Sequence, residues 1–368
     1  MKTKLIAWYL PQYHSIPEND EFWGKGFTDW VTVKNAQPLF KGHQQPRMPL
    51  NHNYYDLSIK ENVIWQAKLA KDHGIYGFGV YHYWFNNEKN LLTKPIEIIY
   101  NNKDIDINYF LAWDNANWKR SWSAVEGNAW APIVEKDETK YGNNGILIPY
   151  IIGNESDWKN HYNHIVQYFK DKRYIKINNK PVFTILQYDE TIVKMSQYWD
   201  ELAQKDGFQG IHFIYKNKRW FDWGEKTFRF NYEPHFDSWL NPTMWERRFE
   251  KLRERIHLPI QKKFYNYDTI WERILETAPK TSSNVYLGAF VDYDDSPRRS
   301  LRGKIVRGAT PEKFKKYLSK LIDISERQGK DFIFITAWNE WGEGAYLEPD
   351  VHNKYGYLEA IKFILSPL

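Results

Sequence analysis

The chain has 368 residues, of which 18% are aromatic, and its 51 basic and 46 acidic residues give a net charge of +5. The absence of cysteine excludes disulfides and thiol-ligated metals, and the scattered basic residues argue against a nucleic-acid partner. No apolar run is long enough to span a bilayer and the start, MKTKLIAWYLPQYH, lacks a signal-peptide pattern, so we expect a cytoplasmic protein without a transmembrane segment.

Apolar stretches that alternate with helical patterns set the predicted fold. The predicted strands are residues 4–10, 75–83, 109–113, 181–187, 210–215, 236–240, 285–290 and 332–337. Helical spacing is found at 58–73, 91–100, 157–169, 192–205, 245–256, 269–277, 311–328 and 355–364. Eight strands alternating with helices close naturally into a parallel barrel. The prediction is therefore an α/β fold, one (β/α)8 TIM-type barrel with long βα loops over residues 1–368.

An open, doubly wound sheet is the competing fold. It would ordinarily carry a glycine-rich phosphate loop after an early strand. Neither GxGxxG nor GxxxxGK[ST] occurs in the chain, which favours the barrel.

Polar and aromatic residues follow most of the predicted strands. The candidates for substrate contact are Tyr9, Gln12, His14, Tyr81, His82, Tyr83, Trp84, Trp113, Asp114, Asn115, Trp118, Asp292, Asp294, Trp338, Asn339 and Trp341. In a barrel these strand ends meet on one face, where functional residues lie. Aromatic rings offer a sugar an apolar stacking face. The alternative is that these residues fill the core or join neighbouring loops, and strand alternation lets only some of residues 81–84 reach a pocket.

Two glutamates in the last strand segment, DFIFITAWNEWGEGAYLEPD, are the strongest catalytic candidates. Glu340 and Glu343 are three residues apart, so a helical turn would point both carboxylates the same way. Such a pair suits glycosidic-bond chemistry, in which one carboxyl is the acid and the other the base or nucleophile. The alternative is an exposed charge pair at the start of a helix.

The acidic cluster after the seventh strand leaves three interpretations open. Asp292, Asp294 and Asp295 could contact sugar hydroxyls, bind a divalent cation or form salt bridges with the nearby arginines. The histidines form no HxH or HxxxH pair and no GxSxG motif occurs, so neither a zinc site nor a serine hydrolase is indicated. We expect no metal and no cofactor.

Five segments resemble the WbsX-type proteins of bacterial surface-polysaccharide gene clusters, a group similar in turn to glycoside hydrolase family 99. They are IAWYLPQYHSIPENDEFWGKGFTDW, GIYGFGVYHYWF, WDNANWKRSW, FKDKRYIKINNKPVF and ITAWNEWGEGAYLEPD. Family 99 includes endo-α-mannosidases and endo-mannanases. The resemblance runs over nearly the whole chain and implies a (β/α)8 barrel that breaks or transfers a glycosidic bond with retention of configuration.

The resemblance also implies roles for the two glutamates. In family 99 the first glutamate of the last-strand motif is the base that acts on the sugar's own 2-hydroxyl, and the second is the acid and then the base; they match Glu340 and Glu343. Two positions depart from the pattern: the third-strand motif reads WDNANW where WANENW is more usual, and Asp29 stands where Glu is expected. Both departures concern sugar specificity.

The leading hypothesis is a carbohydrate-active enzyme that makes or breaks a glycosidic bond of a surface polysaccharide of the O-antigen or capsule type. Its substrate would be an oligosaccharide or polysaccharide. One alternative is strictly an endo-acting glycoside hydrolase, similar to α-mannosidases. The other is a non-catalytic glycan-binding protein, which would keep the tryptophans without needing the glutamates.

Overall fold

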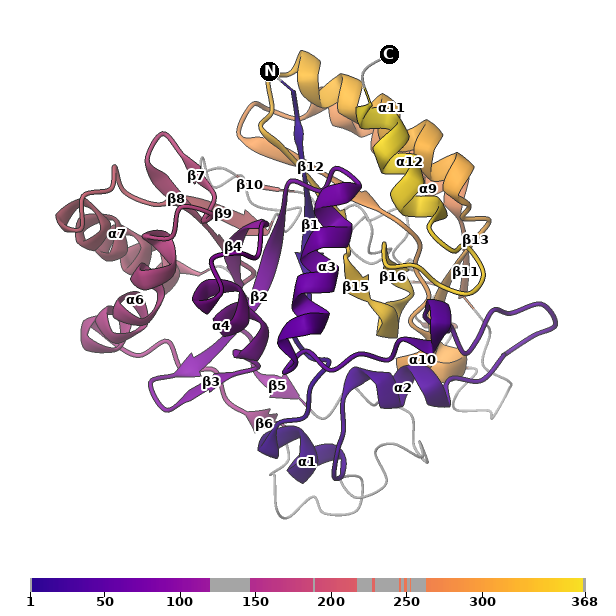
Figure 1. Cartoon of the computed structure of the whole chain (residues 1–368), viewed down its shortest axis with the longest axis horizontal. Helices are drawn as coiled ribbons and strands as arrows, with labels where there is room; N and C mark the ends of the chain where they lie inside the picture. The colour runs from indigo at the N-terminus through magenta and orange to yellow at the C-terminus, as the bar shows by residue number, and fades with distance from the viewer. Residues whose placement is uncertain are drawn as a thin grey trace.

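A mostly parallel β-sheet with helices around it forms the centre of the molecule (Figure 1). The computed structural model describes residues 2–119, 146–187, 189–216, 227–228, 245, 248–249, 252 and 263–366. The parallel strands are β1 (Lys4–Tyr9), β2 (Gly77–Asn86), β4 (Asn108–Trp113), β8 (Lys180–Ile185), β9 (His212–Lys216), β10 (Thr227–Phe228), β12 (Val285–Phe290) and β14 (Phe332–Thr336). The mixed α/β fold that the alternating pattern predicts is therefore present.

Helices follow most of these strands along the chain. The longer ones are α3 (Lys60–Asp72), α4 (Lys94–Asn101), α6 (Glu155–Phe169), α7 (Glu190–Lys205), α9 (Tyr267–Thr277), α11 (Pro311–Arg327) and α12 (Gly356–Leu365). Their buried residues recur at helical spacing, as in α11, where Phe314, Leu318 and Leu321 are buried. Among the described helices, none has the length and apolar character needed to cross a membrane.

The pairing of the strands brings their carboxyl ends together. The order in the sheet is β1, β14, β12, β10, β9, β8, β4 and β2, with every neighbouring pair parallel. Strand β1 pairs in parallel with β2 as well as with β14. Two short strands, β3 (Lys89–Leu91) and β7 (Lys176–Ile177), add antiparallel pairs to β2 and β8. Residues after the parallel strands consequently gather at one edge, where ligand sites of α/β proteins lie.

The segment between β9 and β12 contains one predicted strand and two predicted helices. The predicted strand 236–240 lies outside the described residues, and so does most of the predicted helix 245–256. The described strand there is β10, which the sequence pattern did not indicate because two residues are too few to show a period. It pairs with β9 on one side and β12 on the other.

Short elements in the long loops complete the described part of the chain. The loop after β1 contains α1 (Pro17–Trp23), α2 (Asp29–Asn35) and η1 (Leu50–His52). The other short elements are β5 (Trp118–Lys119), β6 (Ile146–Ile148), β11 (Lys263–Asn266), η3 (Ala278–Lys280), α10 (Ser296–Arg299), η4 (Ser300–Arg302), β13 (Lys304–Arg307), β15 (Asn339–Glu340), η5 (Trp341–Glu343) and β16 (Ala345–Tyr346). Loops of this length usually carry function.

Aromatic residues fill the interior beneath this edge of the sheet. The Trp8 ring stacks on Phe334 with centroids 5.1 Å apart and meets Phe110 edge-on at 5.8 Å. A Cβ atom at Gly79 would lie 2.6 Å from the Trp8 ring, so only glycine lets β2 approach it.

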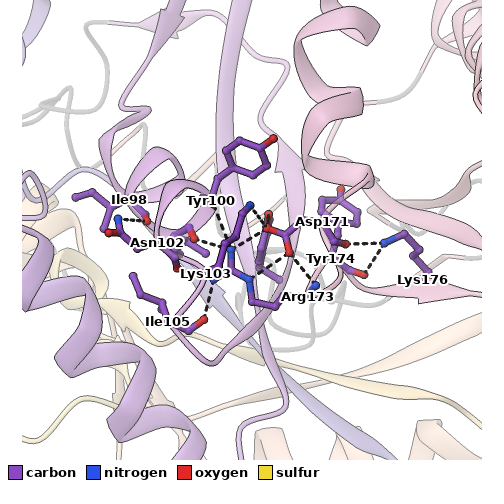
Figure 2. A network of polar contacts seen from close by, with 11 residues as sticks. Ile98, Tyr100, Asn102, Lys103, Ile105, Asp171, Arg173, Tyr174 and Lys176 are labelled. Atoms are coloured by element: carbon purple, nitrogen blue, oxygen red, sulfur yellow. Dashed lines mark hydrogen bonds and ion pairs between the residues drawn. The ribbon is translucent and has the colours of Figure 1, made fainter.

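A polar network, distant in sequence from Glu340 and Glu343, holds the loops around α4 and β8 in place (Figure 2). The Arg173 guanidinium donates to the backbone carbonyls of Ile99 at 2.7 Å and Ile105 at 2.8 Å, and to the Asp171 carboxylate at 2.7 Å. Burial opposes ionisation of Asp171, but these bonds hold its pKa below the usual range. The segment FKDKRYIKINNKPVF, which resembles the WbsX pattern, thus has a structural role in its first half.

Candidate active site

A cavity of about 220 Å³ opens at the carboxyl ends of the parallel strands. Its wall combines aromatic, acidic, basic and amide side chains, as sugar recognition requires. The lining residues are Trp8, Leu10, Gln12, Tyr81, Tyr83, Asp114, Leu186, Gln187, Lys216, Arg298, Arg299, Thr336, Ala337, Glu340 and Glu343. Both predicted catalytic glutamates are therefore in one cavity, together with four of the predicted substrate contacts: Gln12, Tyr81, Tyr83 and Asp114.

One guanidinium holds the two glutamates together. Arg298 of α10 donates to Glu340 Oε1 at 2.8 Å and to Glu343 Oε1 at 2.7 Å. The carboxylates come from β15 and the 3₁₀ turn η5, so the expected helical turn is present in a tight form. A Cβ atom at Gly342 would lie 2.8 Å from Arg298 Nε, which explains the glycine between the glutamates.

A third carboxylate contacts the same guanidinium. Asp29 of α2 accepts a bond of 2.9 Å from Arg298 and one of 2.7 Å from the Gln12 amide, whose oxygen accepts from the Tyr83 hydroxyl at 3.0 Å. Burial lowers the pKa of Arg298, but the carboxylates outweigh it and raise that pKa well above its ordinary value. The guanidinium is thus a permanent positive charge between three acids.

Asp114 adds to the cavity a carboxyl that has no arginine partner among its pKa determinants. Burial raises the pKa of its carboxyl to about 6, and the nearby Lys216 charge opposes the rise. This carboxyl therefore changes charge just below neutral pH. It stands at the position where the third-strand motif departs from the WbsX pattern.

Strand alternation divides the predicted residues of β1 and β2 into two sets. Tyr81 and Tyr83 reach the cavity, whereas His82 Nε2 lies 2.9 Å from His161 Nε2 of α6 on the other side. Trp84 stacks on the same imidazole at 4.5 Å, outside the cavity wall. In β1, Trp8 reaches the cavity, while the Tyr9 hydroxyl donates to Gln66 of α3 at 2.6 Å.

Two predicted asparagines tie strand ends together instead of lining the cavity. Asn339 donates to the Leu10 carbonyl at 2.9 Å and accepts from the Leu10 N–H at 2.8 Å. Asn115 makes the same pair of bonds to Gln187, at 2.8 and 2.6 Å. Each amide thus continues the backbone hydrogen bonding of the sheet beyond the end of a strand.

The tryptophans of the last-strand motif form a buried layer under the glutamates. Trp338 is fully buried, and Trp341 donates from Nε1 to Glu348 at 2.7 Å. Burial raises the pKa of Glu348 to about 7, although hydrogen bonds from Trp341, Tyr55 and Gln66 offset part of the rise. These tryptophans position the motif from below and do not line the cavity.

The acidic cluster after β12 binds the loop that follows α2. Arg47 forms an ion pair of 2.9 Å with Asp292, and the Asp294 carboxylate lies 2.8 Å from His43 Nε2. Burial opposes ionisation of Asp294, but the hydrogen bonds around it hold its pKa at about 2. Of the three interpretations, salt bridging describes the observed contacts. The partners come from the first long loop, and only Asp295 pairs with a neighbouring arginine, Arg299.

The remaining predicted substrate contacts lie either in a smaller recess or in the buried interior. Trp118 lines a smaller recess that shares Gln12 and Arg298 with the cavity. His14 and Trp113 are buried outside the cavity wall, and burial lowers the pKa of His14. No group of three or more metal-ligating side chains occurs within the described residues.

Sequence reasoning missed several residues of the cavity as site residues. They are Trp8, Leu10, Leu186, Gln187, Lys216, Arg298, Arg299, Thr336 and Ala337. Gln187 ends one predicted strand and Lys216 follows another, so their position at strand ends was the available signal. Arg298 was noted only as a salt-bridge partner, because its distance from Glu340 in sequence hides their contact in space.

With this geometry established, comparison with known proteins identifies the family. The model of the family described as Glycosyltransferase WbsX matches residues 5–361. The chain belongs to the WbsX family. Two curated relatives, both described as uncharacterized protein WxcX from strains of Xanthomonas campestris pv. campestris, are 29% identical over the whole chain. The chain spans 50% of their length.

Solved structures share the fold of this WbsX protein. A GH99 endo-alpha-mannosidase from Bacteroides thetaiotaomicron in complex with bis-tris-propane gives a TM-score of 0.58 at 12% identity, over 98% of this chain and 95% of that one. A glycoside hydrolase-like protein gives 0.57 at 14% identity, over 100% and 95%. The family model thus gives the family of the chain, and these structures show a fold that it shares.

Proposed function

We propose that this protein breaks or transfers a glycosidic bond in a bacterial surface polysaccharide, with Glu340 and Glu343 as the catalytic pair. The observation that carries the proposal is the convergence of both carboxylates on Arg298 inside one cavity, at 2.8 and 2.7 Å. Membership of the WbsX family and the fold shared with a GH99 endo-alpha-mannosidase support it. The pairing of β1 with both β2 and β14 supports a closed (β/α)8 barrel as the frame.

In the proposed reaction the sugar's own 2-hydroxyl is the nucleophile. Glu340 takes its proton as the 2-oxygen attacks the anomeric carbon, while Glu343 gives a proton to the departing glycosidic oxygen. A water or an acceptor hydroxyl then opens the three-membered ring, losing its proton to Glu343 as the 2-oxygen recovers one from Glu340. Two successive displacements retain the configuration; such substrate-assisted routes are known exceptions to the double-carboxylate scheme.

The ion pair with Arg298 adds a requirement to this mechanism. Glu340 acts as a base, which is the ionised form that a guanidinium favours. Glu343 must carry a proton before it can act as an acid, and the 2.7 Å contact with Arg298 disfavours that form. We therefore propose that the entering substrate takes over the Arg298 contact, after which Glu343 takes up a proton from solvent.

Mass-spectrometric product analysis tests the proposed function. The protein and its Glu343→Gln variant are incubated with α-linked manno-, rhamno- and gluco-oligosaccharides, with and without nucleotide sugars. Shorter products from the parent protein alone indicate hydrolysis, longer ones without a nucleotide sugar indicate transglycosylation, and extension only with a nucleotide sugar would overturn the mechanism. Tight glycan binding by both proteins without any product would instead support a glycan-binding role.

A further inference from the structure

A small recess beside the glutamates contains two polar side chains that have no hydrogen-bond partner among the described residues. It has a volume of about 40 Å³ and is lined by Trp23, Phe27 and Trp118 among its apolar residues. Asn19 and Thr32 also line it. Both residues are more than nine-tenths buried, with relative exposures of 5% and 2%.

The Asn19 amide and the Thr32 hydroxyl make no hydrogen bond within the part of the chain that the structure describes. Neither residue is among those whose polar atoms are fully enclosed without a partner, so a molecule in the recess can reach the amide and the hydroxyl. Two such groups in one recess therefore point to a ligand with a hydrogen-bonding atom. The surrounding indole and phenyl rings require that the same ligand also be apolar.

The recess adjoins the catalytic cavity. Gln12 and Arg298 line both spaces, and Arg298 is the residue that contacts Glu340 and Glu343. A substituent of a molecule bound at the glutamates is therefore close enough to enter the recess.

We propose that the recess binds an acetyl group carried by one of the sugars at the scissile bond. A water molecule needs roughly 10–15 Å³ of such space, so the recess admits about three heavy atoms, as many as an acetyl group has beyond its linking atom. The acetyl methyl meets the aromatic rings, and its carbonyl oxygen accepts from Asn19 and Thr32. A lone methyl, as in a 6-deoxy sugar, would leave both polar groups unpaired. This inference rests on the proposed function, because it takes the substrate to be a glycan.

The test compares matched glycosides that differ only in the acetyl group. Methyl α-mannoside, its 6-O-acetyl derivative and methyl N-acetyl-α-mannosaminide are titrated against the full-length protein by tryptophan fluorescence, and saturation-transfer NMR maps the bound groups. We expect at least one acetylated probe to bind about tenfold more tightly than the parent glycoside, with the acetyl methyl receiving the strongest saturation. The two acetylated probes distinguish an acetamido from an ester group.

Variants assign the preference to the recess. Asn19→Leu removes the amide at similar volume and is expected to cut the preference for the acetylated probe about fivefold, while binding of methyl α-mannoside is unchanged. Thr32→Val removes the hydroxyl and serves if Asn19→Leu does not fold. Asn35→Leu is the matched control, because Asn35 is exposed at the end of α2, the helix that contains Thr32. Equal binding of all three probes, or a preference that survives both recess variants, would overturn the inference.

Turnover separates this inference from the proposed function. Glycans cleaved equally fast with and without acetyl groups would overturn the acetyl recess and leave the function standing. An acetyl preference that disappears in Asn19→Leu, in a protein that turns over no glycan, would support the recess and refute the catalytic proposal.

Discussion

Arg298 sets the charge balance of the candidate active site. Its guanidinium contacts Asp29, Glu340 and Glu343, so one positive charge serves three carboxylates in a partly enclosed cavity. The side chain is only 16% exposed, which limits the screening of these pairs by water. The arrangement keeps two potential catalysts close together although their charges repel each other.

Replacing Arg298 by methionine is expected to destabilise the protein in a pH-dependent way. Without the guanidinium, the three carboxylates repel one another in a partly enclosed cavity and have lost their shared counter-charge, so folding becomes costly when they are ionised. We expect a loss of about 3–5 kcal/mol in the free energy of unfolding at pH 7, shrinking as the pH falls towards 4. Urea denaturation at both pH values measures it, with Arg273→Met, which breaks an exposed pair, as the control. Equal stability of variant and parent at pH 7 would contradict the account.

Asp114 is expected to make glycan binding depend on pH. Its pKa is raised to about 6, so the carboxylate that we propose accepts hydrogen bonds from sugar hydroxyls is lost as the pH falls through that value. The KM of the parent protein should therefore rise about tenfold between pH 7 and pH 5, consistent with a hydrogen bond to a charged group. In Asp114→Asn the KM should be raised at pH 7 and change little with pH. A variant that keeps the pH profile of the parent would show that another group titrates.

At the scale of secondary structure, apolar runs predicted the strands well because each of these strands is buried on both faces. All residues of β12 and β14 are buried. A continuous apolar run of this kind is typical of a strand in a parallel sheet. The functional edge of the sheet was predictable for the same reason, since polar residues interrupt the runs where the strands end. Alternation explains why Tyr81 reaches the cavity and His82 does not.

Contacts between distant segments were beyond sequence reasoning. Asp29 and Arg298 are 269 residues apart and meet at 2.9 Å, and no local pattern marks either as a partner of the other. Asn339 looked like a sugar ligand because a strand-end amide suits a hydroxyl and a backbone group equally well. Only the position of Leu10 shows which of the two it contacts.

Asn339 is accordingly expected to contribute to stability. Asn339→Ala leaves the buried N–H and carbonyl of Leu10 without partners, and we expect the free energy of unfolding to fall by about 2–4 kcal/mol. Urea denaturation of the variant measures this. If the variant is as stable as the parent but no longer binds glycan, Asn339 acts as a ligand contact and this assignment is wrong.

For the whole molecule, the chain belongs to a family described as glycosyltransferases and shares its fold with a GH99 endo-alpha-mannosidase. The WbsX description implies transfer, while the solved structures that share the fold include a GH99 endo-alpha-mannosidase. The proposed mechanism allows either outcome, because hydrolysis and transfer would differ only in the acceptor that opens the intermediate. The central claim is therefore the catalytic pair and not the acceptor.

The most direct measurement compares binding and turnover of one glycan substrate by the parent protein, Glu340→Gln and Glu343→Gln. Glu61→Gln, an exposed position on α3, is the matched control. The account predicts dissociation constants within about threefold of the parent for both variants and turnover at least about 100-fold slower, with the control unchanged. Turnover by either variant at the parental rate would contradict the assignment of the catalytic pair.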